Sequence, residues 1–328
     1  MLVLDLFAGV GGLGYGFRSA GFEVVGVEVN PCKAEAYALN VGRAISADVR
    51  SVDFSGFGAG ILIAGPPCRP YSAATPKWRR GPLHPEYGLD AEVARAAKET
   101  KPAAVVVEEV PSWRPAPLAR ALRRLGYSVR AEVVAFSRFG APTLRKRWVL
   151  VALRGGRPAR VFRGLGEMAE APPRPIDLIS DLPKEPDGTN DHRACQIRSG
   201  IRGLIPLIPP GHSLASAYRA GLIPRSAAAK YVKDASKKHS YWLYRVPIEG
   251  LMKVVPHPRR SMALHPIYDR MLSVRELARL ITYPDSFSFR PLGVDLAMRS
   301  IAESVPPKFS SKLALALARA IGSTCRNP

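Results

Sequence analysis

Cysteine is scarce in this 328-residue chain, which has only four. The four stand far apart and form no Cys-x-x-Cys pair, so the sequence predicts neither a zinc site nor a disulfide framework, and we expect no bound metal. A chain without a disulfide pattern is typical of a reducing compartment, so we expect a cytoplasmic protein. The cysteines are Cys32, Cys68, Cys195 and Cys325.

Side-chain amides are also rare, with Gln196 the only glutamine and four asparagines in the whole chain. A shortage of these heat-labile groups is a trait of thermophilic proteins. Codon bias in a GC-rich genome would produce the same shortage together with the many Arg, Ala, Gly and Pro residues. Both interpretations stay open.

Long apolar runs are absent, and none approaches the roughly 18–20 residues of a membrane span. The first residues, MLVLDLFAG, have no basic stretch and include Asp5, so they do not predict a signal peptide. The mean hydropathy of −0.03 and the 47% of hydrophobic residues predict a full core and exclude general disorder.

Acidic residues are few, with 27 Asp and Glu against 48 Lys and Arg. The net charge of +21 and the pI near 10.3 argue against a metabolic enzyme with a neutral surface. Such a surplus favours a polyanionic partner, and the missing membrane span makes nucleic acid the better candidate.

Short apolar runs alternate with helical stretches over the first half of the chain. This alternation predicts an α/β fold, with a Rossmann-like, doubly wound and mostly parallel sheet. The expected strands are Leu2–Leu6, Glu23–Val27, Ala44–Ala47, Gly60–Ala64, Ala103–Val107 and Arg147–Leu153, and the expected helices are Gly11–Ala20, Pro31–Leu39, Ala91–Glu99 and Pro117–Leu125.

The alternation is lost after about residue 154, where Pro and Gly become dense. The segment from His192 to Arg260 holds 13 Lys and Arg against two acids, with aromatic residues between them. This concentration predicts a nucleic-acid surface in a smaller, irregular domain. We expect a catalytic domain over residues 1–158, a recognition domain over 159–290, and a C-terminal helix over 291–328 that returns to the first domain.

A glycine-rich turn follows the first expected strand, and Gly9, Gly11 and Gly14 fit the pattern GxGxxG. Glycines let a backbone approach a ligand closely, and the following helix N-terminus favours a negative group. Glu28 ends the second expected strand, where an acid can hold ribose hydroxyls. This pattern suits NAD, FAD or S-adenosylmethionine, and Phe7 favours the last because its ring can cover an adenine.

Three further elements carry chemical groups at the ends of expected strands. Cys68 follows two prolines that stiffen its turn, which suits a nucleophile that is held in place. Glu108 and Glu109 end another strand, where an acid is often functional. Arg145 and Arg147 alternate on an extended segment, so we expect them to point the same way.

Taken together and in this order, these elements resemble the cytosine carbon-5 methyltransferases along the whole chain. Pro67-Cys68 resembles the catalytic Pro-Cys of that family, Glu108 its catalytic Glu, and the two arginines its Arg-x-Arg element. The C-terminal half adds similar motifs at Arg275-Glu276-Leu-Ala-Arg279, Tyr283-Pro284-Asp285 and Ser304-Val305-Pro306-Pro307.

The resemblance implies a DNA cytosine-5 methyltransferase that takes its methyl group from S-adenosylmethionine and releases S-adenosylhomocysteine. Cys68 would attack carbon 6 of a cytosine flipped out of the duplex, Glu108 would donate a proton to ring nitrogen 3, and Arg147 would hold the base and orient Glu108. Arg145 would serve the catalytic loop or a phosphate. The cofactor residues would be Phe7, Gly9, Gly11, Gly12, Leu13, Glu28, Val29, Asp48, Val49, Pro66, Ser304 and Val305, with Asp48 at the adenine amino group.

Duplex DNA is the partner that follows, and a cognate restriction endonuclease as a second partner is left open. We expect a monomer in a prokaryotic cytoplasm, associated with the nucleoid. The DNA-binding residues would be Arg69, Ser72, Arg198, Arg202, Lys237, Lys238, Tyr241, Arg245, Arg259 and Arg260.

The chain departs from the family pattern at four positions. Arg69 replaces the usual Gln after the cysteine, Thr143 another Gln, and Glu109 and Glu303 replace Asn. A second carboxylate near the thiol would oppose thiolate formation. We therefore expect a basic neighbour, with Arg69 as the candidate, to neutralise Glu109.

Three alternatives remain beside the leading interpretation. A tRNA methyltransferase of the same fold would carry a Cys-Phe-Thr element, which the sequence lacks. A catalytically silent DNA-binding relative would not need the retained Cys68, Glu108, Arg145 and Arg147. A nicotinamide dehydrogenase would account for the glycines and leave the Pro-Pro-Cys turn unexplained.

Overall fold

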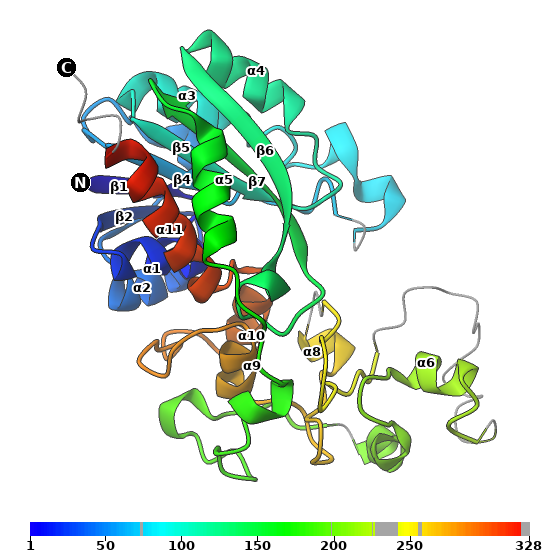
Figure 1. The fold of residues 1–328 in the computed structure, drawn as a ribbon. Helices are drawn as coiled ribbons and strands as arrows, with labels where there is room; N and C mark the ends of the chain where they lie inside the picture. Colours follow the sequence, from blue (N-terminus) through cyan, green and yellow to red (C-terminus); the bar gives the residue numbers. More distant parts are fainter. Residues whose placement is uncertain (73–74, 198, 225, 227–241, 255–257, 323–328) are drawn as a thin grey trace. The chain divides into compact units, whose positions relative to one another are not determined.

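The fold of the chain was examined in a computed structural model (Figure 1). It describes all residues except 73–74, 198, 225, 227–241, 255–257 and 323–328. The chain forms two compact units. Unit 1 comprises Met1–Gly140, Lys146–Ala171 and Ser304–Pro328, and unit 2 comprises Ala141–Arg145 and Pro172–Glu303.

Unit 1 is built on a seven-stranded sheet of order β3-β2-β1-β4-β5-β7-β6. The first five strands run parallel, and β7 pairs antiparallel with both β5 and β6. The expected mostly parallel α/β sheet is therefore confirmed. The strands are β1 (Leu2–Leu6), β2 (Glu23–Glu28), β3 (Ala44–Ser46), β4 (Ile61–Ala64), β5 (Ala104–Glu109), β6 (Tyr127–Ala135) and β7 (Lys146–Arg154).

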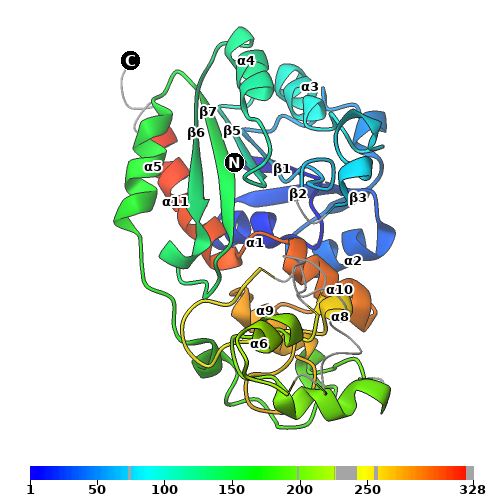
Figure 2. The same cartoon turned by 90° about the vertical axis from the view of Figure 1, so that its right-hand side faces the viewer.

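Helices cover both faces of this sheet. Near β6 and β7, α5 and α11 lie on one side and α3 and α4 on the other (Figure 2). The longer helices of unit 1 are α1 (Gly12–Ser19), α2 (Pro31–Asn40), α3 (Ala91–Thr100), α4 (Ala116–Arg124), α5 (Pro158–Glu167) and α11 (Pro307–Gly322). Its 3-10 helices are Val49–Ser51, Lys77–Arg79, Gly81–Leu83 and Phe136–Arg138.

Because both faces of the central strands are covered, they are apolar at every position rather than at alternate ones. Leu4, Leu62 and Val105 belong to a cluster that also takes in buried residues of α3 and α4. Their neighbours along the strands, such as Ile63 and Val106, point to the opposite face and are equally buried.

The sequence analysis missed strand β6 and helix α5. Strand β6 is the edge of the sheet and carries the exposed residues Ser128 and Arg130, so it lacks the apolar run that marked the central strands. Helix α5 packs within unit 1 and α10 (Val294–Glu303) within unit 2. The two units therefore divide near residues 171 and 303, rather than near 158 and 290.

Unit 2 has short helices joined by long irregular segments, and its core is smaller. Ile205, Leu214, Leu243 and Leu264 are among its buried apolar residues. None of the helices within the described ranges is long and apolar enough to cross a membrane. Over its described residues, unit 2 has the helices α6 (Leu214–Arg219), α8 (Pro258–Ser261), α9 (Val274–Leu280) and α10, with 3-10 helices at Pro175–Leu178, Thr189–Asp191 and Ser199–Leu207.

Candidate active site

The motif residues of unit 1 gather at the edge formed by the carboxyl ends of β1, β2, β4 and β5 (Figure 1). These strands are parallel neighbours, so the segments that leave them emerge at one edge of the sheet. The glycine-rich turn follows β1, Glu28 ends β2, the Pro-Pro-Cys turn follows β4, and Glu108 and Glu109 end β5.

The turn after β1 is fixed by left-handed backbone conformations and by Glu28. Phe7 has φ +58° and Gly9 φ +58°, and Gly11 has φ +99°. The Glu28 carboxylate accepts hydrogen bonds from the N–H groups of Gly9 and Asn30, each 2.8 Å long. A Cβ on Gly9 would meet no atom within 4 Å, so the space beside this turn is open to a ligand.

The glycine pattern has a second cause that spacing alone does not reveal. The ring of Tyr37 lies beneath the turn, and a Cβ on Gly11 would lie 2.4 Å from Val41 and 3.0 Å from this ring. A Cβ on Gly14 would lie 2.6 Å from both the Tyr37 hydroxyl and Asp5 Oδ2. Two of the three glycines therefore make room for a buried tyrosine, and only Gly9 faces open space.

Asp5 and Tyr37 form a buried pair in which the tyrosine hydroxyl donates to Asp5 Oδ2 over 3.2 Å. Burial raises the pKa of Asp5 to about 8 and also raises that of Tyr37. Asp5 therefore holds its proton at neutral pH. Sequence reasoning missed this pair because the helical period places Tyr37 on a buried face without indicating its partner.

Most of the predicted cofactor residues lie around the glycine-rich turn or at the ends of β2 and β3, whereas Pro66 follows β4, and Ser304 and Val305 follow α10. Val29 follows β2 with 67% of its surface exposed, which is unusual for valine and leaves an apolar contact free. Both Asp48 oxygens accept hydrogen bonds from Arg50, which lowers the pKa of Asp48 to about 2. The buried members of the set are Gly11, Gly12, Leu13, Glu28, Val49, Pro66 and Val305, and the partly exposed ones include Phe7, Gly9 and Ser304.

Cys68 lies in a tight turn. Its backbone carbonyl oxygen accepts hydrogen bonds from the N–H groups of Tyr71 (3.0 Å) and Ser72 (2.8 Å). Its side chain is partly exposed and packs against the apolar cluster of the sheet. The turn is braced from the segment after β5, where the Ser112 hydroxyl donates to Tyr71 O over 2.7 Å. The thiol is thus held in place while remaining accessible.

Glu108 is paired with Arg147, whose Nε lies 2.9 Å from Glu108 Oε1. Both side chains are largely buried, with 11% and 12% of their surfaces exposed. Antiparallel pairing of β5 with β7 places Glu108 opposite Val149, so Arg147 two residues away lies on the same face. A Cβ on Gly65, three residues before Cys68, would lie 3.9 Å from Glu108 Oε2, so the carboxylate adjoins the start of the cysteine turn.

Glu109 points to the other face of β5 and is 1% exposed. Burial raises its pKa to about 9, and one carboxyl oxygen accepts from the N–H of Val110. Our expectation that Arg69 neutralises it is wrong, because Arg69 is exposed and lies 3.5 Å from Glu86. Glu109 is neutral because it is protonated, and the second negative charge expected near the thiol is absent at neutral pH.

Arg145 has a different environment from Arg147. Only 3% of Arg145 is exposed, and its guanidinium donates to the carbonyls of Ala302 and Glu303, both over 2.8 Å. It therefore caps the carboxyl end of α10 within unit 2, where a cation also favours the helix dipole. The assignment of Arg145 to a catalytic loop or a phosphate is not supported, because the side chain is used for this cap.

The predicted DNA-binding residues fall into three groups. Arg69 and Arg202 are exposed, and Ser72 is partly exposed. Arg245 is 3% exposed, and its guanidinium donates to four backbone carbonyls and to Asp269, so it stabilises unit 2 and is withdrawn as a DNA contact. Arg198, Lys237, Lys238 and Tyr241 lie outside the described residues, as do the side chains of Arg259 and Arg260.

The Arg-Glu-Leu-Ala-Arg motif of α9 is a structural centre of unit 2. Arg275 is fully buried, and its guanidinium donates to the carbonyls of Asn190, Pro284 and Phe287. Glu276 completes a capping box with Ser273 and pairs with Arg270 at 2.7 Å. The motif therefore holds together segments that are far apart in the sequence.

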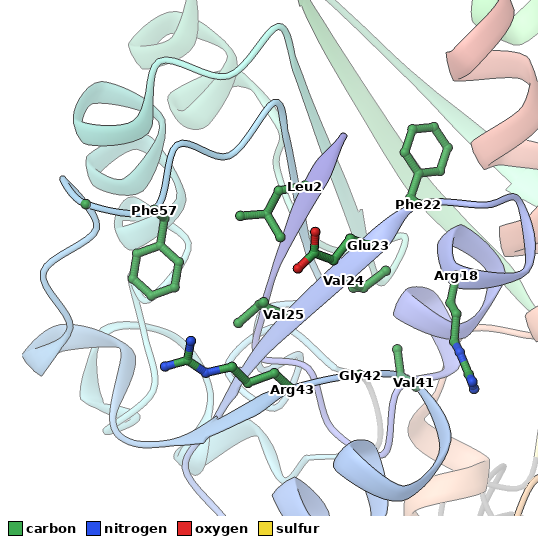
Figure 3. Close-up of a pocket in the computed structure, with 11 residues that line it drawn as sticks. Leu2, Arg18, Phe22, Glu23, Val24, Val25, Val41, Gly42, Arg43 and Phe57 are labelled. Carbon is green, nitrogen blue, oxygen red and sulfur yellow. The ribbon is translucent and has the colours of Figure 1, made fainter.

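A depression of about 640 Å³ at the other edge of the sheet is not this site. It lies at the amino ends of β1 and β2, beside Leu2 and Glu23, and Arg18 and Arg43 flank it (Figure 3). None of the predicted site residues lines it. Within the described ranges, no group of three or more His, Cys, Asp or Glu side chains is placed to hold a metal.

Comparison with known proteins gives a consistent result over nearly the whole chain. The family model described as C-5 cytosine-specific DNA methylase matches residues 1–319. The chain is 28% identical to the type II methyltransferase M1.HphI of Haemophilus parahaemolyticus, covering 96% of this chain and 86% of that protein. It is 26% identical to M.NgoFVII of Neisseria gonorrhoeae, covering 95% and 85%.

Solved structures with low sequence identity share the fold. A prophage-encoded protein described as a DNA modification methyltransferase (E. coli) superposes with a TM-score of 0.68 at 21% identity, covering 98% of this chain and 99% of that one. The Dnmt2 methyltransferase of S. pombe gives a TM-score of 0.64 at 18% identity, covering 97% and 98%.

Proposed function

Because the chain belongs to the C-5 cytosine-specific DNA methylase family and is a DNA cytosine-5 methyltransferase, we propose that Cys68 and Glu108 carry its reaction on a flipped-out cytosine. The observation that carries this proposal is the Glu108–Arg147 pair at the end of β5, next to the start of the cysteine turn.

Carbon 5 of cytosine is a weak nucleophile until a group adds at carbon 6. The Cys68 thiolate adds there, and the sulfur–carbon bond turns the ring into an enamine that can accept a methyl group at carbon 5. The later loss of the carbon-5 hydrogen and of the sulfur restores the aromatic ring. A rigid turn favours this step because the sulfur is already near its attacking position.

Glu108 gives a proton to ring nitrogen 3 as the thiolate adds, which prevents charge from building up on the ring. Arg147 fixes the carboxyl group through Oε1 and leaves Oε2 directed toward the Gly65 side. The neutral state of Glu109 keeps a second negative charge away from the thiolate.

S-adenosylmethionine suits the turn after β1, and it supplies the methyl group when bound. Gly9 gives open space for a close backbone approach, and Glu28 retains lone pairs for ribose hydroxyls beside its two N–H contacts. Phe7 and the exposed Val29 offer apolar contacts for an adenine ring.

Unit 2 and the basic segment from His192 to Arg260 recognise the target sequence in this proposal. The positive charge of that segment supports phosphate contacts, and the buried Arg245 and Arg275 support the loops that carry it. A chemical step on one base requires that the base leave the duplex. We also propose a monomer that acts within a restriction-modification system, as the type II names of its relatives suggest.

The test is product analysis after incubation of unmethylated genomic DNA, and separately of tRNA, with labelled S-adenosylmethionine. The proposal expects 5-methylcytosine in DNA and none in tRNA. Bisulfite sequencing of the product should then give a single short sequence around each modified base. Label in tRNA alone, or methylated bases without a common flanking sequence, would contradict the proposal.

A further inference from the structure

Unit 1 carries a second concentration of positive charge that the basic segment of unit 2 does not include. Residues 98–163 hold 15 Lys and Arg but only four acids. Two of these acids are buried at the end of β5, and the other two pair with Arg95 and Arg130. Apart from the buried Arg145 and from Arg147, which pairs with Glu108, the remaining arginines of this region are exposed and have no ion pair with these four acids.

Six of these arginines form what we call the α4–α5 arginine surface. All six are exposed, and the side chains of five of them make no ion pair or hydrogen bond to any described residue. The sixth, Arg123, donates only to the carbonyl of Val129, over 3.3 Å. The surface comprises Arg120, Arg123 and Arg124 on α4, and Arg157, Arg160 and Arg163 at the start of and along α5.

The two helices bring these arginines to the same corner of the sheet. Arg124 lies three residues before Tyr127, and Arg157 lies three residues after Arg154. Tyr127 and Arg154 are directly paired between β6 and β7. Three residues span at most about 10 Å, so Arg124 and Arg157 both lie close to the Tyr127–Arg154 pair. Helices α4 and α5 approach this pair from opposite faces of the sheet (Figure 2).

Helix stability accounts for only part of this arrangement. Arg123 and Arg124 lie in the last turn of α4, where cations are favourable. Arg157 is the N-cap of α5 and Arg160 lies in its first turn, which contains no acid. Cations at a helix N-terminus oppose the helix dipole, so α5 carries them at a cost to its own stability.

A surface selected only for solubility mixes both signs of charge, whereas this one carries a single sign. A positive field of this kind attracts a polyanion, and the guanidinium group is suited to paired contacts with phosphate. The corner lies at the amino end of β5, because Leu153 pairs with Ala104 there. It is therefore distinct from the edge that holds Cys68 and Glu108.

We propose that the α4–α5 arginine surface binds the phosphate backbone of duplex DNA, as a second contact without sequence preference. Such a contact holds the enzyme on DNA that lacks a target, which raises the local concentration of targets farther along the duplex. It goes beyond the methyl-transfer proposal, since it requires neither the cofactor nor a flipped base.

The test compares two double variants of the full-length protein that lose the same charge. Arg157→Gln/Arg160→Gln removes two arginines of the surface. Arg18→Gln/Arg43→Gln removes two from the opposite side of the sheet, where they flank the depression of Figure 3. Binding to a labelled duplex of random sequence is measured by fluorescence anisotropy over a series of salt concentrations, and thermal denaturation checks that each variant is folded.

The first variant should make the negative slope of log K against log salt shallower by about 1.8, because each lost phosphate contact removes about 0.9 from its magnitude. The second should leave the slope unchanged, and Arg120→Gln/Arg124→Gln should behave as the first. Equal slopes in all the proteins would overturn the proposal, as would an equal loss in the Arg18/Arg43 control.

A loss of binding to RNA without a loss of binding to DNA would assign the surface to RNA instead and would also overturn the proposal. The outcome is independent of the methyl-transfer proposal, because the assay uses DNA without cofactor. A wild-type protein that makes no 5-methylcytosine but shows the expected slopes would reject the proposed chemistry alone.

Discussion

Arg147 and Glu108 are joined across β7 and β5 by a contact of 2.9 Å between Nε and Oε1, and both side chains are nearly buried. The adjacent Glu109 lies on the opposite face and has no such cation. Two neighbouring carboxyl groups on one strand thus differ in their partners and in role.

Glu108→Gln should reduce methyl transfer by about 10²–10⁴-fold, the usual loss when a general acid is removed. Glu109→Asn, which restores the family residue, should retain most of the activity because Glu109 is already neutral. Single-turnover rates on a duplex containing the target measure both effects. An inactive Glu109→Asn beside an active Glu108→Gln would mean that the catalytic register is shifted by one residue.

Glu109→Gln should stabilise the protein at neutral pH. The folded pKa near 9 lies above the ordinary value of 4.5, so folding stability falls as pH rises from about 4.5 to 9 and the unfolded chain alone loses the proton. Removing the carboxyl group should raise the free energy of unfolding at pH 7 by on the order of 2 kcal/mol.

Denaturation in urea at pH 5 and at pH 8 measures this difference. The variant should exceed wild type more at pH 8 than at pH 5. A residual pH dependence is expected in both proteins from Asp5, whose pKa is likewise raised. An equal difference at the two pH values would show that Glu109 does not titrate as described.

Gly14→Ala should destabilise unit 1 and weaken cofactor binding, although Gly14 faces away from the open side of the turn. Its new methyl group would lie 2.6 Å from Asp5 Oδ2 and from the Tyr37 hydroxyl. Overpacking of this kind costs about 1–3 kcal/mol. Thermal denaturation and calorimetric titration with S-adenosylhomocysteine measure the two effects.

Gly166→Ala in α5 is the matched control, because a Cβ there would meet no atom within 4 Å. It should leave cofactor affinity unchanged and slightly raise the melting temperature, since alanine favours helix over glycine. Equal affinities for all three proteins would contradict the account of the turn.

Arg245→Gln should lower the free energy of unfolding of unit 2 by about 3–5 kcal/mol. The substitution leaves Asp269 and buried backbone carbonyls without their hydrogen-bond donor. Arg202→Gln, at an exposed position, should leave stability unchanged and weaken DNA binding. Urea denaturation and anisotropy on the two variants separate the roles. A stable Arg245→Gln with reduced DNA affinity would restore Arg245 as a direct contact.

The sequence predicted the parallel part of the sheet and the placement of the motif residues, because buried strands leave unbroken apolar runs such as Ala103–Val107. Strand β6 was missed because its exposed edge breaks that pattern at Ser128 and Arg130. The candidate site rests on the order of motifs along the chain and stays a prediction. The burial of the arginine side chains and their hydrogen-bond partners were not predictable from the sequence. Arg145 and Arg245 were therefore assigned to contacts with substrate or DNA, although the guanidinium groups of both donate to backbone carbonyls.

Glu109 illustrates the same limit from the opposite side. Its residue type suggested a negative charge that needed a basic partner. Its burial instead raises its pKa, so the carboxyl group stays protonated and neutral. Tyr37 gave no signal in the sequence, because a tyrosine in a helix usually indicates core packing. Its contact with Asp5 arises only when β1 and α2 are brought together in the fold.

The most direct test of the central claim is mass spectrometry of nucleosides from unmethylated DNA treated with S-adenosylmethionine and either wild-type protein or Cys68→Ser. The account predicts 5-methylcytosine with the wild type and none with the variant, while both proteins bind DNA and S-adenosylhomocysteine with similar affinity. Full formation of 5-methylcytosine by Cys68→Ser, or a different methylated base from the wild type, would contradict it.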